Sequence, residues 1–307
     1  MTDIAILIKS YSRDRDYAGR LVSSIAEFNI ERIPVYLVVP ESEQSLFASV
    51  LSDGVEILTE ESVAGRYLID EGAHGLSAGY LNQEIVKLAF GSTGLADNYF
   101  CVDSDAVFIR DFGASDFLRR PGEPYSVLVQ DKELEIEPRY FREHWQGRER
   151  SIRRIMDYVG LDDPIMRTCH GHQVFSSAVL KSFREEFLEP RGWTFASAVQ
   201  EIPYEFSWYN MWLQKSGVIP IHQIEPLVKV FHNEDQHLAS LMRGEGVEDF
   251  ARAYLALVVN SNYSRDVGLV DASGDKRELL GQYYSYRELL EVFASKGKET
   301  ARRRLGR

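Results

Sequence analysis

Two aspartates lie close together in the segment "NYFCVDSDAVFIRDF", residues 98–112. Asp103 and Asp105 follow four mostly apolar residues, and apolar residues resume directly after them. Two carboxylates at the end of a buried strand are costly unless something compensates their charge. Side chains two residues apart on an extended segment point the same way, so both carboxylates could face one divalent cation. Mg²⁺ and Mn²⁺ prefer oxygen ligands and complete their coordination with phosphate oxygens.

The same pair could also belong to a simple turn or to a phosphatase. Asp is common where a strand ends, because its carboxylate bonds to nearby backbone N–H groups. The pattern also resembles that of haloacid-dehalogenase-type phosphatases, in which Asp103 would be the nucleophile. Asp162 and Asp163 would then imitate the later metal-binding pair of such enzymes. Their nucleophile follows the first strand of the domain, whereas several strand–helix units precede Asp103. A turn, a phosphatase nucleophile and a metal site all stay open at this point.

The elements before the aspartates alternate between strands and helices. Continuous apolar runs predict buried strands, and apolar residues at helical spacing predict helices. This alternation predicts an α/β fold with a mostly parallel sheet that helices cover on both faces. Ligands of such sheets bind beyond the carboxyl ends of the strands, where the aspartates lie. The predicted strands are residues 4–10, 33–40, 54–59 and 98–103, and the predicted helices are residues 18–28, 42–51 and 81–90.

The pattern after residue 120 is less regular. Strands are predicted over residues 125–130 and 218–224, and a helix over residues 140–160. Residues 172–187 begin as a strand and continue as a helix, and residues 205–217 form a helix that ends at a glycine. From about residue 233 the chain is predicted to be mainly helical. We therefore expect a catalytic domain over residues 1–237 and a helical C-terminal extension over residues 238–307, which ends in a basic tail.

Composition limits the classes of partner. The formal charge of −12 argues against broad nucleic-acid binding. Cys101 and Cys169 are the two cysteines and predict a cytoplasmic protein with reduced thiols. No leader and no run of about 20 apolar residues is visible. The basic tail, residues 295–307, is either a solvated end or a contact with an anionic membrane surface at the inner face.

The aspartate segment resembles the metal-binding segment of nucleotide-sugar glycosyltransferases with the GT-A fold. Later segments follow in the order that such proteins use: "HGHQVFSSAVL", "YEFSWYNMWL" and "VFHNEDQH". The series is similar to a bacterial group of GT-A-like proteins often associated with surface polysaccharide synthesis. It covers about residues 4–237. The resemblance implies a metal-dependent transfer of a sugar, with a UDP-sugar as the favoured donor, to a glycan or related hydroxyl acceptor.

The resemblance also implies roles for single residues. Asp105 is the direct ligand of Mn²⁺ or Mg²⁺ and acts in catalysis, Asp103 is its partner, and His232 is a third ligand with His237 as a rival. His170 and His172 offer a weaker metal pair. Residues expected near the nucleotide sugar are Lys9, Ser10, Tyr11, Arg13, Gln83, Lys87, Asp103, Ser104, His172 and Gln173. Lys87 has the alternative of a solvated place on its helix.

Glu205 is the candidate general base. An inverting transferase needs a carboxylate that takes the proton of the acceptor hydroxyl as its oxygen attacks the anomeric carbon. Glu205 could equally be a helix-start carboxylate stabilised by the dipole. Three tryptophans could stack on sugars, although a core position is favoured for them: Trp193, Trp208 and Trp212. A non-catalytic scaffold that binds nucleotide sugars is the remaining alternative.

Overall fold

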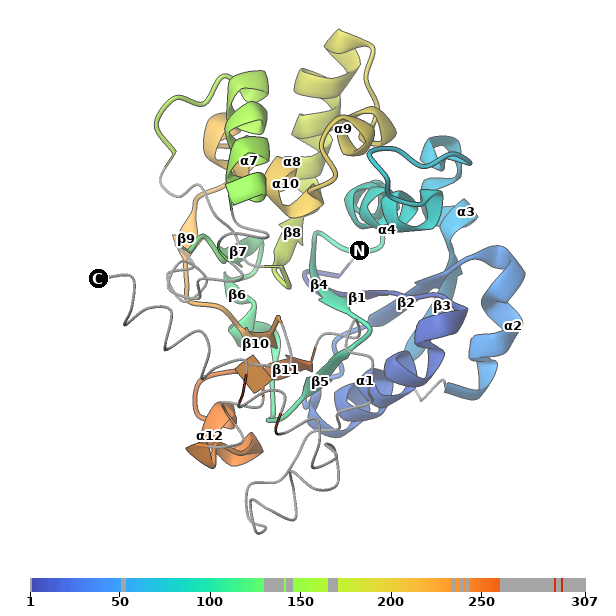
Figure 1. Ribbon diagram of the computed structural model, residues 1–307, viewed down its shortest axis with the longest axis vertical. Coiled ribbons are helices and arrows are strands. Elements are labelled where there is room, and N and C mark those ends of the chain that lie inside the picture. Colours follow the sequence, from blue (N-terminus) through green and yellow to red (C-terminus); the bar gives the residue numbers. More distant parts are fainter. Residues whose placement is uncertain are drawn as a thin grey trace. The chain divides into compact units, whose positions relative to one another are not determined.

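A computed structural model of the chain is shown in Figure 1. The chain divides into two compact units, Met1–Leu227 and Val228–Arg307, and each unit is described by itself. The residues described are 2–50, 54–129, 141, 146–164, 171–232, 236–237, 240, 243–259, 290 and 294.

Five strands form the main sheet of the first unit, in the order β3-β2-β1-β4-β8. The first four run parallel, and β8 is antiparallel to β4. The predicted mostly parallel sheet is therefore confirmed. The strands are β1 Ala5–Lys9, β2 Val35–Val39, β3 Val55–Thr59, β4 Asn98–Asp103 and β8 Val174–Ser176.

Helices cover both faces of this sheet, as the continuous apolar strands require. All residues of β1 and β2 are buried, and α1 and α4 lie on opposite sides of the sheet (Figure 1). On one face, Leu7 of β1 belongs to the same core cluster as Leu81 and Ile85 of α4. On the other face lies α1, with Leu21 and Ile25 buried (Figure 1). The sheet is thus the middle layer of three.

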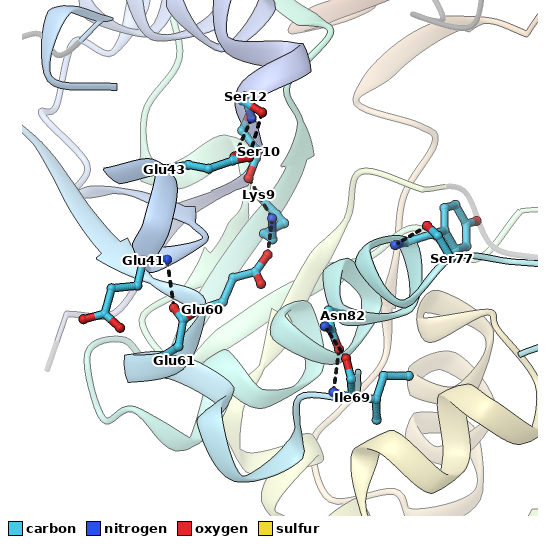
Figure 2. Close-up of polar contacts among 11 residues, drawn as sticks. Lys9, Ser10, Ser12, Glu41, Glu43, Glu60, Glu61, Ile69, Ser77 and Asn82 are labelled. Atoms are coloured by element: carbon cyan, nitrogen blue, oxygen red, sulfur yellow. Dashed lines mark hydrogen bonds and ion pairs between the residues drawn. The ribbon is translucent and has the colours of Figure 1, made fainter. Parts of the chain in front are cut away.

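The helices of the first unit follow the predicted order. The Ser77 side chain accepts a hydrogen bond from the backbone N–H of Tyr80 (3.2 Å), which caps α4 at its start (Figure 2). Gly217, in the left-handed conformation with φ 60°, ends α10 as predicted. The helices are α1 Arg15–Phe28, α2 Gln44–Phe47, α3 Glu60–Ala64, α4 Ala78–Ala89, α7 Gln146–Val159, α8 Ser177–Ser182, α9 Phe195–Glu201 and α10 Glu205–Ser216.

Short strands complete the first unit. β5 Ala106–Phe108 follows β4, and a small sheet joins β6 Leu118–Arg120, β7 Glu123–Ser126 and β9 His222–Gln223. The strand predicted over residues 125–130 is shorter and starts earlier. Its partner β9 offers only two residues for pairing, so β7 ends at Ser126 although the apolar run continues. The apolar run that continues after Ser126 therefore indicates that these residues are buried, and it does not indicate the length of the strand.

The indole rings are part of the core. Trp208 is fully buried, and its Nε1–H donates to the carbonyl oxygens of Ala198 and Ile202 at 3.0 and 2.9 Å. Trp212 is also buried and donates to Ser182 Oγ at 3.1 Å. Trp193 packs against the same cluster and is partly buried. The favoured core position is confirmed for Trp208 and Trp212.

The second unit contains a parallel pair of strands, β10 Val228–Phe231 and β11 Ala256–Val259, and the short helix α12 Val247–Ala251. Within the stretch expected to be mainly helical, β11 is a strand, because its sequence "ALVV" is partly β-branched and pairs along β10. Most of the predicted helical extension, and all of the basic tail at residues 295–307, lie outside the described residues.

Candidate active site

The carboxyl ends of β1 and β4 meet at the point where the strand order reverses. β2 and β3 lie on one side of β1, and β4, the next strand of the sheet along the chain, lies on the other side. Lys9 and Asp103, the last residues of the two strands, are register partners. Open α/β sheets bind their ligands at this kind of switch point. The predicted site residues that follow β1 and those that follow β4 therefore belong to one edge of the sheet.

The two aspartates do not share an extended segment. β4 ends at Asp103, Ser104 and Asp105 form a turn, and β5 begins directly after it. The expectation that both side chains lie on one extended segment and point the same way is thus wrong. Ser104 is buried and hydrogen-bonds to the Asp14 side chain, which ties this turn to the segment after β1. Burial raises the pKa of Asp14, against the nearby charge of Arg13 and the bond to Ser104.

Lys87 connects two carboxylates. Its Nζ lies 2.9 Å from Asp103 Oδ1 and 2.9 Å from Glu205 Oε1, and its side chain is only 5% exposed. The ammonium also lies over the ring of Phe206, 4.9 Å from the centroid. Burial alone would lower the pKa of Lys87, but the charges of Asp103 and Glu205 outweigh it and hold the pKa well above its usual value. Lys87 is therefore charged and does not lie on the solvated helix surface.

His172, two residues before β8, contacts Asp103. Its backbone is in the left-handed region (φ 59°), which is uncommon for a residue with a side chain. Its Nδ1 accepts the backbone N–H of Asp103 at 3.4 Å, which assigns the proton of the neutral ring to Nε2, 3.7 Å from Asp103 Oδ2. Burial lowers the pKa of His172, against the attraction of Asp103. The imidazole is therefore neutral at pH 7.

Gln173 presents an amide that is fully buried. Among the described residues neither its Oε1 nor its Nε2 has a hydrogen-bond partner. Its backbone carbonyl accepts the N–H of Cys101 at 3.0 Å, so its main chain is fixed against β4. Buried amides are rarely left unsatisfied. The amide of Gln173 is therefore equipped to bond a hydroxyl group or an ordered water.

A second buried cation lies at the end of β1. Lys9 Nζ lies 2.6 Å from Glu60 Oε1 and donates to the carbonyl of Ser10 at 2.7 Å (Figure 2). Burial lowers the pKa of Lys9, although the charge of Glu60 opposes the shift. Beside it, Glu43 accepts from the backbone N–H and the hydroxyl of Ser12 at 2.6 and 2.7 Å. These contacts hold the loop that follows β1 against the segments after β2 and β3.

The remaining predicted donor residues are more exposed. Tyr11 and Arg13 are exposed on the loop between β1 and α1, and Gln83 is half-buried on α4. The structure thus brings Lys87, Asp103, Glu205 and His172 into contact, while Lys9 pairs with Glu60. Ser10 is buried, and its hydroxyl has no partner among the described residues.

The predicted histidine ligands fall in three places. His232, at the end of β10 in the second unit, is half-buried, and its backbone N–H donates to Gln236 Oε1 at 2.9 Å. His237 is buried in the same unit with its ring centroid 5.0 Å from that of Phe231. Burial lowers the pKa of His237 to about 4. His170 lies outside the described residues.

The donor set of the first unit fits a divalent cation that substrate oxygens help to hold. Where the structure describes the chain, no three His, Cys, Asp or Glu side chains come together as a metal site. Lys87 faces the carboxylates of Asp103 and Glu205, and Asp105 adds a third carboxylate, so two formal negative charges remain. Mg²⁺ is often held by one or two carboxylates together with phosphates.

Sequence reasoning missed three acidic residues of this edge: Asp14, Glu60 and Glu84. Two of them had a signal in the sequence. Glu60 directly follows β3, at the same edge as Asp103. Glu84 interrupts the apolar face of α4, three residues after Leu81 and one before Ile85. A charged residue at a core position of an amphipathic helix indicates a paired or protonated group.

A comparison with protein families matches residues 1–237 to the model described as "Family of unknown function (DUF6492)". The chain belongs to the DUF6492 family. A search of curated proteins finds no match. Among solved structures, this DUF6492 chain is similar to the galactosyltransferase LgtC in complex with donor and acceptor sugar analogs. The TM-score is 0.50 at 13% identity, over 92% of this chain and 96% of that one.

A second similar structure is the bifunctional glycosyltransferase WbbM in its apo form. Its TM-score is 0.50 at 15% identity, over 95% of this chain and 51% of that one. Mouse xyloside xylosyltransferase 1 in its apo form gives 0.45 at 10% identity, over 85% and 99%. The first two likenesses identify the fold of this DUF6492 member as GT-A-like, as predicted. The haloacid-dehalogenase alternative gains no support, since three parallel strands, β1, β2 and β3, precede the strand that ends at Asp103.

Among the described residues, none of the helices combines the length and the apolar character needed to cross a bilayer. Membrane contact of the basic tail, the alternative to a solvated end, concerns residues outside the described part of the chain and stays a hypothesis.

Proposed function

We propose that this protein is a metal-dependent glycosyltransferase that moves a sugar from a nucleotide-sugar donor, with UDP-sugars favoured, to a hydroxyl of a glycan or related acceptor. The observation that carries the proposal is the bridge from Asp103 through Lys87 to Glu205 at the switch point of a GT-A-like fold. It joins a carboxylate of the predicted metal segment to the predicted general base.

Asp105 and Asp103 would hold a Mn²⁺ or Mg²⁺ ion, with Asp105 as the direct ligand because an oxygen of Asp103 already bonds to Lys87. When bound, such a cation neutralises charge on the leaving nucleoside diphosphate. Asp105 is half-buried in its turn and so is reachable by a ligand. His232 remains the proposed third ligand. The cation also accounts for the binding of an anionic donor by a protein with a charge of −12.

The other residues predicted to contact the donor differ in how deeply they are buried. The exposed ring of Tyr11 would stack on the base, and the exposed guanidinium of Arg13 would approach the diphosphate. Lys9, Ser10 and Gln83 would line the side of the nucleotide. His172 and Gln173 would line the sugar, since the amide of Gln173 has hydrogen-bonding capacity to offer. Ser104 would hold the turn through Asp14.

Glu205 would act as the general base. Lys87 holds its Oε1 at 2.9 Å and so fixes the orientation of the carboxylate. In an inverting transfer, the O–H bond of the acceptor breaks, its proton passes to Glu205, and its oxygen bonds to the anomeric carbon. The bond from that carbon to the diphosphate oxygen breaks at the same centre, and the diphosphate leaves with the electron pair.

The test is release of nucleoside diphosphate from a panel of nucleotide sugars with Mn²⁺ and mixed glycan acceptors. Asp105→Ala should abolish metal-dependent release, whereas Asp111→Asn, an exposed aspartate six residues later, should leave it intact. Wild-type protein that releases no diphosphate from any donor contradicts a catalytic role. If it still binds nucleotide sugars, the scaffold alternative gains support.

A further inference from the structure

One face of α4 carries three polar side chains. Tyr80, Glu84 and Lys87 are spaced four and three residues apart, so they lie one above the other on the helix. Glu205, the first residue of α10, meets this face through its 2.9 Å bond to Lys87. Lys87 thus bonds to Glu205 of α10 and shares its helix face with a second carboxyl group, that of Glu84.

The Glu84 carboxyl is badly placed for a negative charge. The residue is only 3% exposed, and its Oε2 is buried with no hydrogen-bond partner in the described part of the chain. The Tyr80 hydroxyl is its hydrogen-bond partner. An ionised carboxylate is strongly disfavoured when one of its oxygens is buried without a hydrogen-bond partner. Such a group binds a proton instead.

The charges around Glu84 do not compensate the negative charge that its carboxyl would carry when ionised. Facing it are Tyr80 and Lys87 from α4, Glu205 from α10 and Arg148 from α7. The ammonium of Lys87 bonds directly to Asp103 and Glu205, so its charge is already matched. Burial first, and then the Glu205 carboxylate, raise the pKa of Glu84 well above its usual value, against Lys87, the Tyr80 hydrogen bond and Arg148.

We propose that Glu84 is a positioning residue of the transfer reaction: its carboxyl is uncharged and so leaves the ammonium of Lys87 to Glu205 and Asp103. Lys87 bonds to Glu205, whereas the buried Oε2 of Glu84 has no hydrogen-bond partner among the described residues, so the proton stays on Glu84. Glu84 acts through Glu205 and not on the substrate. Its role in transfer rests on the proposed function, while its protonation does not.

The consequence appears on the alkaline side of the pH profile. When Glu84 ionises, a third negative charge competes with Asp103 and Glu205 for Lys87 and weakens the bridge. Transfer should then fall about tenfold per pH unit above the pKa of Glu84, as for a single titrating group. Glu84→Gln, which imitates the neutral acid, should keep the rate at pH 7 and lose this alkaline limb. Glu71→Gln, at an exposed position before α4, should keep the wild-type profile.

Infrared spectroscopy of the full chain tests the protonation without any substrate. Protein labelled with ¹³C at the glutamate carboxyls separates Glu84 from aspartates such as Asp14. A glutamic acid C=O stretch at pH 7 that disappears in Glu84→Gln supports the proposal. Absence of that stretch in the wild-type protein overturns it, whether or not the protein transfers sugar.

Two further outcomes decide the positioning role. An unchanged alkaline limb in an active Glu84→Gln variant overturns it. If that variant does not fold, the wild-type spectrum decides alone. A stretch that is present at pH 7 and disappears together with transfer at higher pH supports the proposal, and transfer that falls while the stretch persists overturns it.

Discussion

Lys87 Nζ and Glu205 Oε1 are 2.9 Å apart, although 118 residues separate them in the sequence. The bond joins α4, the helix before the aspartate strand, to the first turn of α10. Because Lys87 also bonds to Asp103, a single ammonium fixes the orientation of two carboxylates from different elements. The arrangement of the candidate site therefore depends on one buried cation.

Lys87→Met should destabilise the protein and abolish transfer. Removing one partner of a buried ion pair leaves the other charge uncompensated and costs about 3 kcal/mol. Here Glu205 is buried, and Asp103 is partly exposed and loses less. Urea unfolding measures the change, with Lys181→Met, at an exposed position on α8, as the control. Equal stability of the two variants would show that the bridge is energetically unimportant.

Glu60→Gln should also destabilise the protein, by about 3 kcal/mol, because the buried ammonium of Lys9 would lose its carboxylate partner and keep only neutral acceptors, the Ser10 carbonyl and the amide oxygen of the new side chain. The same change should raise KM for the nucleotide sugar more than it lowers kcat, since Lys9 lies at the proposed nucleotide side. Glu56→Gln on the exposed face of β3 is the matched control. A normal KM in Glu60→Gln would remove Lys9 from the donor contacts.

Gln173→Met should stabilise the free protein and impair transfer. Replacing an unsatisfied buried amide by an apolar side chain of similar size removes a desolvation cost of about 1 kcal/mol. If the amide serves a substrate hydroxyl, the variant loses that bond. Thermal unfolding and steady-state kinetics, measured together, test both halves. A variant that is both more stable and fully active would show that Gln173 bonds no substrate group.

Acid should weaken the second unit through His237. Burial lowers the pKa of His237 from 6.5 to about 4 in the native state. Between pH 4 and pH 6.5 this histidine is therefore protonated in the unfolded chain and neutral in the native protein. This contribution is complete above pH 6.5 and falls by about 3 kcal/mol as the pH drops to 4. Compared with the wild-type protein, His237→Gln should show a smaller loss of stability between pH 7 and pH 4 in urea unfolding. Parallel curves would contradict the prediction, as would a His237 NMR titration near 6.5.

Local pattern predicted much of the fold. The apolar runs of β1, β2 and β4 and the helical spacing of α1 and α4 are properties of neighbouring residues, so they are readable without tertiary contacts. The candidate site could be predicted only in part from the sequence. Lys87 was predicted to lie near the donor, but its bond to Glu205 depends on the packing of α10 against α4. The turn at Ser104 and Asp105 depends on the buried hydrogen bond to Asp14, and no spacing in the sequence reveals that bond.

The central claim, a divalent cation and a nucleotide sugar bound at the aspartate turn, is tested most directly by thermal unfolding with nucleoside diphosphates and nucleotide sugars, each with and without Mn²⁺. Ligand at 100 times its Kd stabilises the native state by about 2.7 kcal/mol. We predict a rise in Tm for UDP or a UDP-sugar that requires Mn²⁺, disappears in Asp105→Ala and persists in Asp111→Asn. No rise for any nucleotide in either condition would contradict the account.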